Sequence, residues 1–239
     1  KGNTRIDGNR NNYTGEKLVA LNKIGEILDR NGTIYLDVDK LALFTNYQKL
    51  DLTGQGLTTL EMLEGMTKLK YLNLSNNKIT LEDTKSQEIL GKMSDLNELN
   101  LSENYITNAT AINNLKKLTK LSILGNNNNI DLSQIEDIIA NLAFLRISNE
   151  TLKTIKNCDS EKITCIRLNT SSLKEIPDLS SFTKLKILDL ASNSNISNFN
   201  EVSKISNLEN LKLTSNNLHN RMIDFSKLTK LTDLDLSSN

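Results

Sequence analysis

The sequence predicts an α/β solenoid with a curved, parallel β-sheet on its concave face and short helical or 3-10 returns on its convex face. A phrase with the spacing LxxLxLxxNxI recurs along the 239 residues at a nearly constant interval, and such self-similarity is typical of repeat architectures. The stretch before the first phrase has helical periodicity instead. We therefore also expect an α-helical cap at the N-terminal end.

The phrase is clearest at Leu96–Ile106, and it returns at Leu69–Ile79 and Leu208–Leu218. Its LxLxx segment predicts a short strand, whose alternate residues point to opposite faces. The leucines then stack on those of neighbouring coils and form a continuous core. This is the signature of a leucine-rich repeat.

The Asn of the phrase has a structural role in this interpretation. Its side chain offers two N–H donors and a carbonyl acceptor, which can satisfy the backbone groups of the turn after each strand. The expected Asn ladder consists of Asn77, Asn104, Asn126, Asn193, Asn216 and Asn239. Glu150 and Ser171 stand where Asn is expected, so the ladder should weaken there.

Nine repeats are predicted, and the last one is incomplete. They start at Tyr47, Leu69, Leu96, Leu118, Leu142, Ile163, Leu185, Leu208 and Leu231. The interval between the repeat starts Leu69 and Leu96 is the longest, at 27 residues. Its extra residues lie at Thr84–Met93 and predict a fuller helix on the convex side. The predicted organisation is a flexible lead-in over 1–14, a helical cap over 15–46 and repeats over 47–239. Because a stack that ends within a phrase exposes its core, we expect further chain beyond Asn239.

The cap also contains a segment that resembles an EF-hand loop, Asp29–Lys40. Ile34 stands at the position normally held by Gly, and Lys40 at that of the bidentate Glu. A lysine amine repels calcium, so we favour a cap without metal over a working calcium site.

The composition narrows the classes of function that this chain could have. The 29 Lys and Arg residues balance 29 Asp and Glu residues, which argues against nucleic-acid binding through a basic surface. No apolar run reaches the roughly 18 residues of a membrane span. With a single histidine, His219, no Gly-rich phosphate loop and no CxxC motif, we expect neither catalysis nor a cofactor. A monomer is expected. Cys158 and Cys165 could form a disulfide, although we prefer two free thiols.

The repeat register predicts which side chains line the concave face. Phe144, Cys165 and Ile187 occupy the same solvent-facing position in consecutive coils, and Arg146 and Arg167 flank them. Apolar and Arg residues together are typical of an interface hot spot, whereas isolated exposed apolar residues are common on any surface. The predicted ligand-binding residues are Tyr71, Phe144, Arg146, Cys165, Arg167, Ile187 and Asp189.

The phrase LTKLTDLDLSSN at Leu228–Asn239, the period near 22 residues and the EF-hand-like cap resemble the internalin-type leucine-rich repeat proteins of bacterial surfaces. The passage Leu28–Ile79 is similar to secreted leucine-rich proteins of clostridial and related Gram-positive bacteria. The resemblance implies a secreted or cell-surface, adhesin-like module that binds a partner protein, often from a host, on its concave face. One departure is that internalin returns often carry Pro, and this chain has only Pro177.

Two alternatives stay open at this stage. The similar 22-residue repeats of a protein phosphatase regulator would imply an intracellular scaffold or regulatory subunit. The chain could also be the recognition arm of a larger secreted effector whose catalytic domain lies elsewhere.

Overall fold

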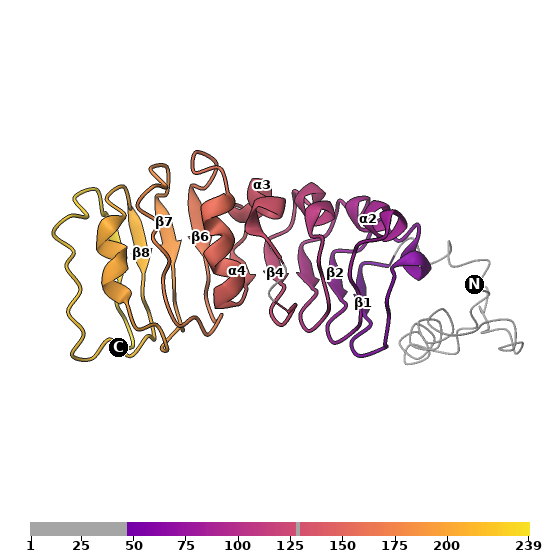
Figure 1. The fold of residues 1–239 in the computed structure, drawn as a ribbon, viewed down its shortest axis with the longest axis horizontal. Coiled ribbons are helices and arrows are strands. Elements are labelled where there is room, and N and C mark those ends of the chain that lie inside the picture. Colours follow the sequence, from indigo (N-terminus) through magenta and orange to yellow (C-terminus); the bar gives the residue numbers. More distant parts are fainter. Residues whose placement is uncertain (1–46, 128–129) are drawn as a thin grey trace, which may run out of the picture. The chain divides into compact units, whose positions relative to one another are not determined.

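The computed structural model describes residues 47–127 and 130–239 (Figure 1). They fall into two compact units, divided after Leu118. We call residues 47–118 the first unit and the described residues from 119 to 239 the second unit. The predicted lead-in and the predicted EF-hand-like cap, with its Asp29–Lys40 segment, lie outside the described residues.

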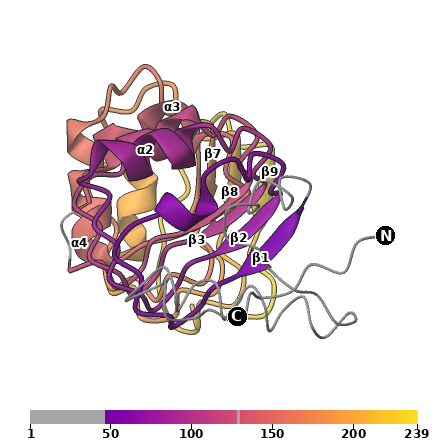
Figure 2. The same ribbon diagram turned by 90° about the vertical axis from the view of Figure 1, so that its right-hand side faces the viewer.

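The first unit contains three parallel strands, and core leucines face each other across the sheet. Leu50 is in register with Leu72, and Leu72 with Leu99. The strands are β1 (Lys49–Asp51), β2 (Tyr71–Asn73) and β3 (Glu98–Asn100). The returns are the 3-10 helix η3 (Glu61–Leu63), helix α2 (Thr84–Gly91) and the 3-10 helix η4 (Thr110–Asn114). In Figure 2, the strands lie on one side of this unit and α2 lies on the other.

Helix α2 occupies the longest coil, as the sequence predicts. Asp83 caps its N-terminus, because the Asp83 carboxylate accepts a hydrogen bond from the Ser86 N–H at 2.7 Å. Ile89 and Leu90 are buried on its inner face. A cap of this kind stabilises a short helix by about 1 kcal/mol, and the apolar face fixes its position against the core.

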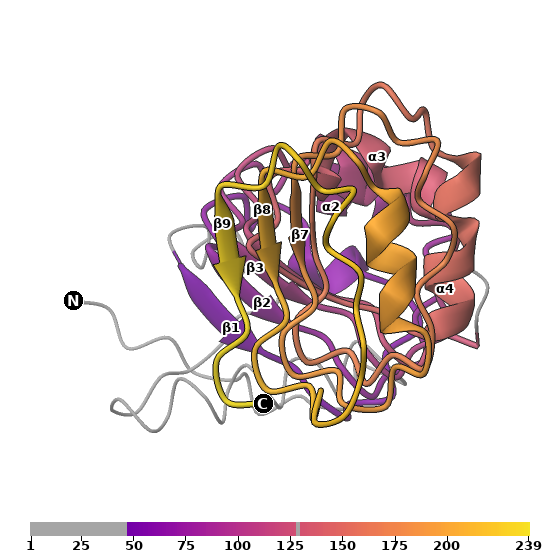
Figure 3. The same cartoon turned by 90° about the vertical axis from the view of Figure 1, so that its left-hand side faces the viewer.

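The second unit contains six strands in two groups. Strand β4 pairs with β5, whereas β6, β7, β8 and β9 form a separate parallel sheet. The strands are β4 (Lys120–Ser122), β5 (Phe144–Arg146), β6 (Cys165–Arg167), β7 (Ile187–Asp189), β8 (Asn210–Lys212) and β9 (Asp233–Asp235). The helices are η5 (Leu132–Ile135), α3 (Glu136–Ile139), α4 (Asn149–Lys153), η6 (Thr154–Asn157) and η7 (Phe199–Lys204). Figure 3 shows β7, β8 and β9 opposite the helix α4.

The strand register matches the predicted repeats. Each of the nine described strands begins two residues after a predicted repeat start, so its middle residue points to the core. These middle residues are buried in the first eight strands, and Leu234 in β9 is 42% exposed. The described chain is therefore a leucine-rich repeat solenoid, and the predicted fold class is confirmed.

Candidate functional site

Asparagine side chains connect successive coils wherever the repeat is regular. Asn216 is fully buried, accepts a hydrogen bond from the Asn193 N–H at 2.6 Å and donates to the Leu190 carbonyl at 2.9 Å. The residue before it, Ser215, has a left-handed φ of 58°, a conformation that costs energy in a non-Gly residue. The side-chain hydrogen bonds hold the turn in that shape.

Four further asparagines make the same two contacts with the preceding coil. Each donates to a backbone carbonyl at the end of the strand in the preceding coil. Each also accepts from a backbone N–H in the turn that follows that strand. They are Asn77, Asn104, Asn193 and Asn239. Asn126 donates to the Ile123 carbonyl of its own coil at 2.9 Å.

The coil that begins with β5 has a different turn. Helix α4 starts almost directly after the strand, because the Ser148 side chain caps it by accepting from the Thr151 N–H at 3.1 Å. Glu150 therefore lies on the exposed face of a helix, where it pairs with Lys153 at 3.1 Å, instead of at a ladder position. None of the residues 147–151 has a left-handed φ. The helix has replaced the turn that an Asn would hold.

Strands β5 and β6 consequently meet without pairing as a sheet. Ser171, which is buried, bridges them, because its Oγ donates to the Leu145 carbonyl at 3.0 Å and accepts from the Ile147 N–H at 3.4 Å. The Asn169 Nδ2 also reaches the Ala143 carbonyl at 3.4 Å. We call this junction, defined by β5, β6 and the side chains of Asn169 and Ser171, the seam.

The third residue of each strand shows which side chains on the strand face have a local structural role. Where this residue is Asp or Asn, its side chain accepts a hydrogen bond from the backbone N–H two residues later. This occurs at Asp51, Asn73, Asn100, Asp189 and Asp235. At Asp235 the hydrogen bonds from Ser237 lower the pKa of the carboxyl group. Arg146, Arg167 and Lys212 hold the same strand position and cannot accept such a bond.

Two of the predicted ligand-binding residues are buried, so the expectation that they face solvent is wrong. Asp189 is 9% exposed because its carboxylate bonds the Ala191 N–H at 2.9 Å and lies 3.4 Å from the Asn169 Nδ2. Cys165 is 5% exposed. Its short side chain is in register with the longer Ile187 on the neighbouring strand. Neither residue offers much surface to a partner.

The remaining apolar residues of the predicted patch keep part of their surface. Phe144 and Ile187 are each the first residue of a strand, and both are partly exposed. They are more covered than expected, since neighbouring side chains on a parallel sheet are only about 4.8 Å apart. Unlike the core leucines, they are not enclosed, so they remain open to contact from outside.

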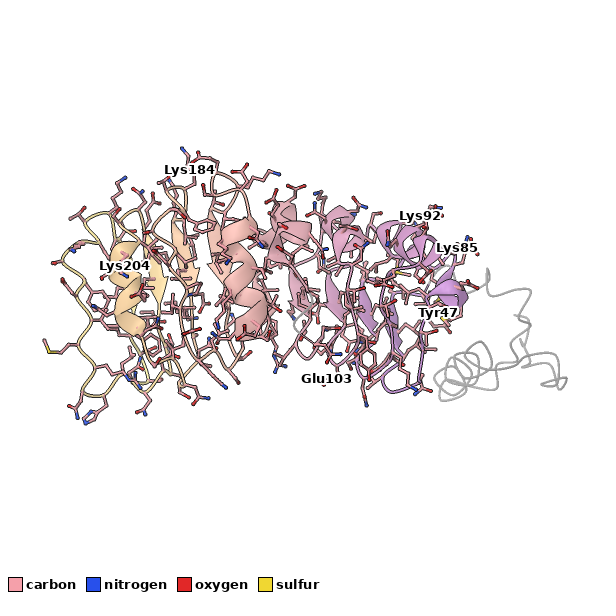
Figure 4. All side chains as sticks on the ribbon, in the orientation of Figure 1. Tyr47, Lys85, Lys92, Glu103, Lys184 and Lys204 are labelled. Atoms are coloured by element: carbon pink, nitrogen blue, oxygen red, sulfur yellow. The ribbon has the colours of Figure 1, made fainter. Side chains whose placement is uncertain are left out.

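The two arginines carry charges that the described chain does not neutralise. Arg146 and Arg167 are partly exposed, and neither forms an ion pair with any described residue. Five lysines of the same unit do form ion pairs. Ion pairs with carboxylates hold Lys153, Lys162, Lys184, Lys186 and Lys204. Figure 4 labels two of these paired lysines, Lys184 and Lys204.

Two buried polar atoms at the seam have no hydrogen-bond partner: the Nε of Arg146 and the Oδ1 of Asn169. Most buried polar atoms in proteins are paired, so two such atoms on consecutive coils mark this junction as unusual. The sequence interpretation missed Asn169. The available signal was the loss of Asn at positions 150 and 171, which indicated an interrupted ladder.

Tyr71 belongs to the first unit and is described by itself. It is partly exposed at the first position of β2, and the Lys49 ammonium lies 5.0 Å from the centre of its ring. This is a cation–π contact, and at an exposed site it contributes about 0.5–1 kcal/mol.

The two thiols lie in the interior of the second unit, and the other candidate groups form no metal-binding cluster in the described ranges. Cys158 and Cys165 are free and buried. Burial raises the pKa of both thiols, that of Cys158 to about 12. Within residues 47–127 and 130–239, no three His, Cys, Asp or Glu side chains gather as a metal-binding group. No helix in those ranges is long and apolar enough to cross a membrane.

Comparisons with known proteins agree with this fold. Residues 45–85 match the family model described as leucine-rich repeats in two copies. No curated protein sequence matches the chain. Among solved structures, internalin C2 of Listeria monocytogenes is 22% identical, with 92% of each chain covered and a TM-score of 0.50.

Two other Listeria monocytogenes structures are less similar in three dimensions. The internalin InlF is 24% identical, with 93% of this chain and 69% of that chain covered and a TM-score of 0.48. The functional domain of InlJ is 23% identical, with 90% of this chain and 45% of that chain covered and a TM-score of 0.38. The chain is thus a leucine-rich repeat solenoid, with a fold similar to that of internalin C2.

Proposed function

We propose that this protein is a binding module that holds a partner protein on the strand face of its second unit, around Phe144 and Ile187. The observation that carries the proposal is the position of these two side chains. They project from the strand face, opposite the core leucines, and keep exposed surface. The leucine core does not require an apolar side chain there, and large apolar residues flanked by Arg are typical binding anchors.

Binding is better supported than catalysis by the groups at this face. They are an aromatic ring, an aliphatic side chain and guanidinium groups, which suit recognition. The one nucleophile among them, Cys165, is buried and has a raised pKa, and a protonated thiol is a poor nucleophile. The internalin-like sequence phrase at Leu228–Asn239 extends the proposal to a secreted or cell-surface bacterial module, adhesin-like in role, whose partner is a host surface or matrix protein.

The test begins with a panel of purified host-cell ectodomains and matrix proteins, probed with the full chain. Once a partner is identified, its affinity for Phe144→Ala and Ile187→Ala is measured by calorimetry. Loss of a true anchor costs at least about 2 kcal/mol, which is roughly thirtyfold in affinity.

The matched control is Lys156→Glu, on the return side of the same coil as Phe144. Lys156 is exposed in η6 and has no partner in the described chain, so this variant should bind like the wild type. If Phe144→Ala and Ile187→Ala keep full affinity while Lys156→Glu loses it, the binding face is the return side and the proposal is wrong.

A further inference from the structure

We infer that Arg146 and Arg167 together bind a carboxylate of the partner. The partner then presents an acidic side chain next to the apolar residue that contacts Phe144. This inference rests on the proposed binding face and adds the chemistry of the partner. The two arginines hold the same position, the third residue, in consecutive strands β5 and β6.

The first argument is geometric. The Arg167 Nη1 lies 3.4 Å from the carbonyl oxygen of Leu142, two residues before β5 begins. The Arg167 side chain therefore extends across the seam toward the start of β5, the strand that carries Arg146 at its other end. Because a guanidinium group has five N–H donors in a rigid fork, this single long contact leaves most donors of Arg167 available.

The second argument is electrostatic. Asp189 is the register partner of Arg167 on β7, yet the two form no ion pair, and the Asp189 carboxylate already accepts from the Ala191 N–H. The strand face near the seam thus carries two positive charges without a counter-ion from the described chain. Other cations of the same unit, such as Lys162, Lys186 and Lys204, do form ion pairs with carboxylates.

The third argument is the environment of Arg146. Its Nε atom is buried and has no hydrogen-bond partner, so the stem and the near part of the guanidinium are held among other atoms, while the residue as a whole stays partly exposed. Interactions between charges are stronger where water is partly excluded. Arg and carboxylate groups form short, often bidentate hydrogen bonds, and a partly buried Arg is well placed to make one.

The experiment uses a displayed library of random 12-residue peptides as the probe and the full chain as the bait. We expect the wild type to enrich peptides with Asp or Glu beside an aromatic or aliphatic residue. Synthetic copies of these peptides should lose roughly tenfold or more in affinity for the pair Arg146→Gln with Arg167→Gln, because Gln cannot form the charge-assisted hydrogen bonds that a guanidinium makes to a carboxylate. The charge-reversed pair, Arg146→Glu with Arg167→Glu, should instead enrich peptides with Lys or Arg.

The controls separate this inference from the proposed function. Circular dichroism verifies folding, and Arg146→Lys replaces the Glu variant if that one fails to fold. Arg146→Lys should weaken peptide binding, because Lys cannot form the bidentate contact. Peptides without Asp or Glu that still need Phe144 would overturn the carboxylate inference and leave the binding face standing. Peptides that bind Phe144→Ala and both arginine pairs as tightly as the wild type would overturn both. A wild-type chain that enriches no peptides would also count against the carboxylate inference.

Discussion

The regular coils of β6 to β9 and the coil of β5 and α4 belong to the same unit and solve the same packing problem in different ways. In the regular coils, Asn193 and Asn216 each bind the preceding turn, and the strands form a continuous sheet. In the β5 coil, α4 replaces the turn, and the sheet stops at the seam.

The difference teaches that the core and the ladder are separable. Leu145 and Leu188 are equally buried, although only one of them lies in the regular part. At the seam, Ser171 connects the coils through two hydrogen bonds in place of strand pairing. Two side-chain atoms at this junction, the Arg146 Nε and the Asn169 Oδ1, are buried without a hydrogen-bond partner.

Core substitutions should have the largest effect on stability, and this effect should be equal in the β5 coil and in the regular coils. Leu145→Ala and Leu188→Ala should each lower the free energy of unfolding by about 2–5 kcal/mol, since each removes a fully buried side chain. Chemical denaturation measures the change. A much smaller loss for Leu145→Ala would mean that the core is also interrupted at the seam.

Substitutions that remove the hydrogen bonds between coils should have the next largest effect on stability. This effect should differ between the regular coils and the seam. Asn216→Ala leaves the Asn193 N–H and the Leu190 carbonyl without their partner, so we expect a loss of about 1–3 kcal/mol. Ser171→Ala removes bonds of 3.0 and 3.4 Å and should cost about 1 kcal/mol. Denaturation curves recorded side by side give the two values. The reverse order would show that Ser171 is the more important connection.

A smaller change should follow from removing the cap of α4. Ser148→Ala deletes the acceptor for the Thr151 N–H, and such a loss costs about 1 kcal/mol. The matched variant in the first unit is Asp83→Ala at the start of α2, which should cost a similar amount. Equal stability of Ser148→Ala and the wild type would mean that α4 does not depend on this cap.

Folding should lower the reactivity of the two thiols, whereas their raised pKa should not make stability depend on pH near neutrality. The pKa of Cys158 rises to about 12 from an ordinary value of 9.0, mainly through burial. The folded state therefore keeps the proton. This contribution to stability is complete below about pH 9 and is lost as the pH rises from the unfolded toward the folded pKa.

Iodoacetamide and mass spectrometry check this point. At pH 8.5 the folded protein should be alkylated far more slowly than the protein in guanidinium chloride. Rapid alkylation of Cys158 in the folded protein would show that the thiol is exposed or its pKa ordinary.

Much of the fold can be predicted from the sequence, because each repeat restates the spacing of core leucines. That spacing predicts all nine strands and the helix in the longest coil. The seam is harder to predict. The loss of Asn at Glu150 and Ser171 indicates an interrupted ladder, but whether β5 and β6 still pair depends on how α4 packs, which a single repeat does not encode. The register also cannot tell that Asp189 closes a turn or that Cys165 is covered by its neighbours.

We propose that the strand face near the seam serves binding, whereas the leucines beneath it serve folding. The most direct test compares Phe144→Ala with Leu188→Ala in one binding titration against the identified partner, under conditions in which both variants are folded. We expect Phe144→Ala to lose at least about thirtyfold in affinity with a small change in stability, and Leu188→Ala to bind normally despite its large loss of stability. Normal binding by Phe144→Ala, or unfolding of that variant, would contradict it.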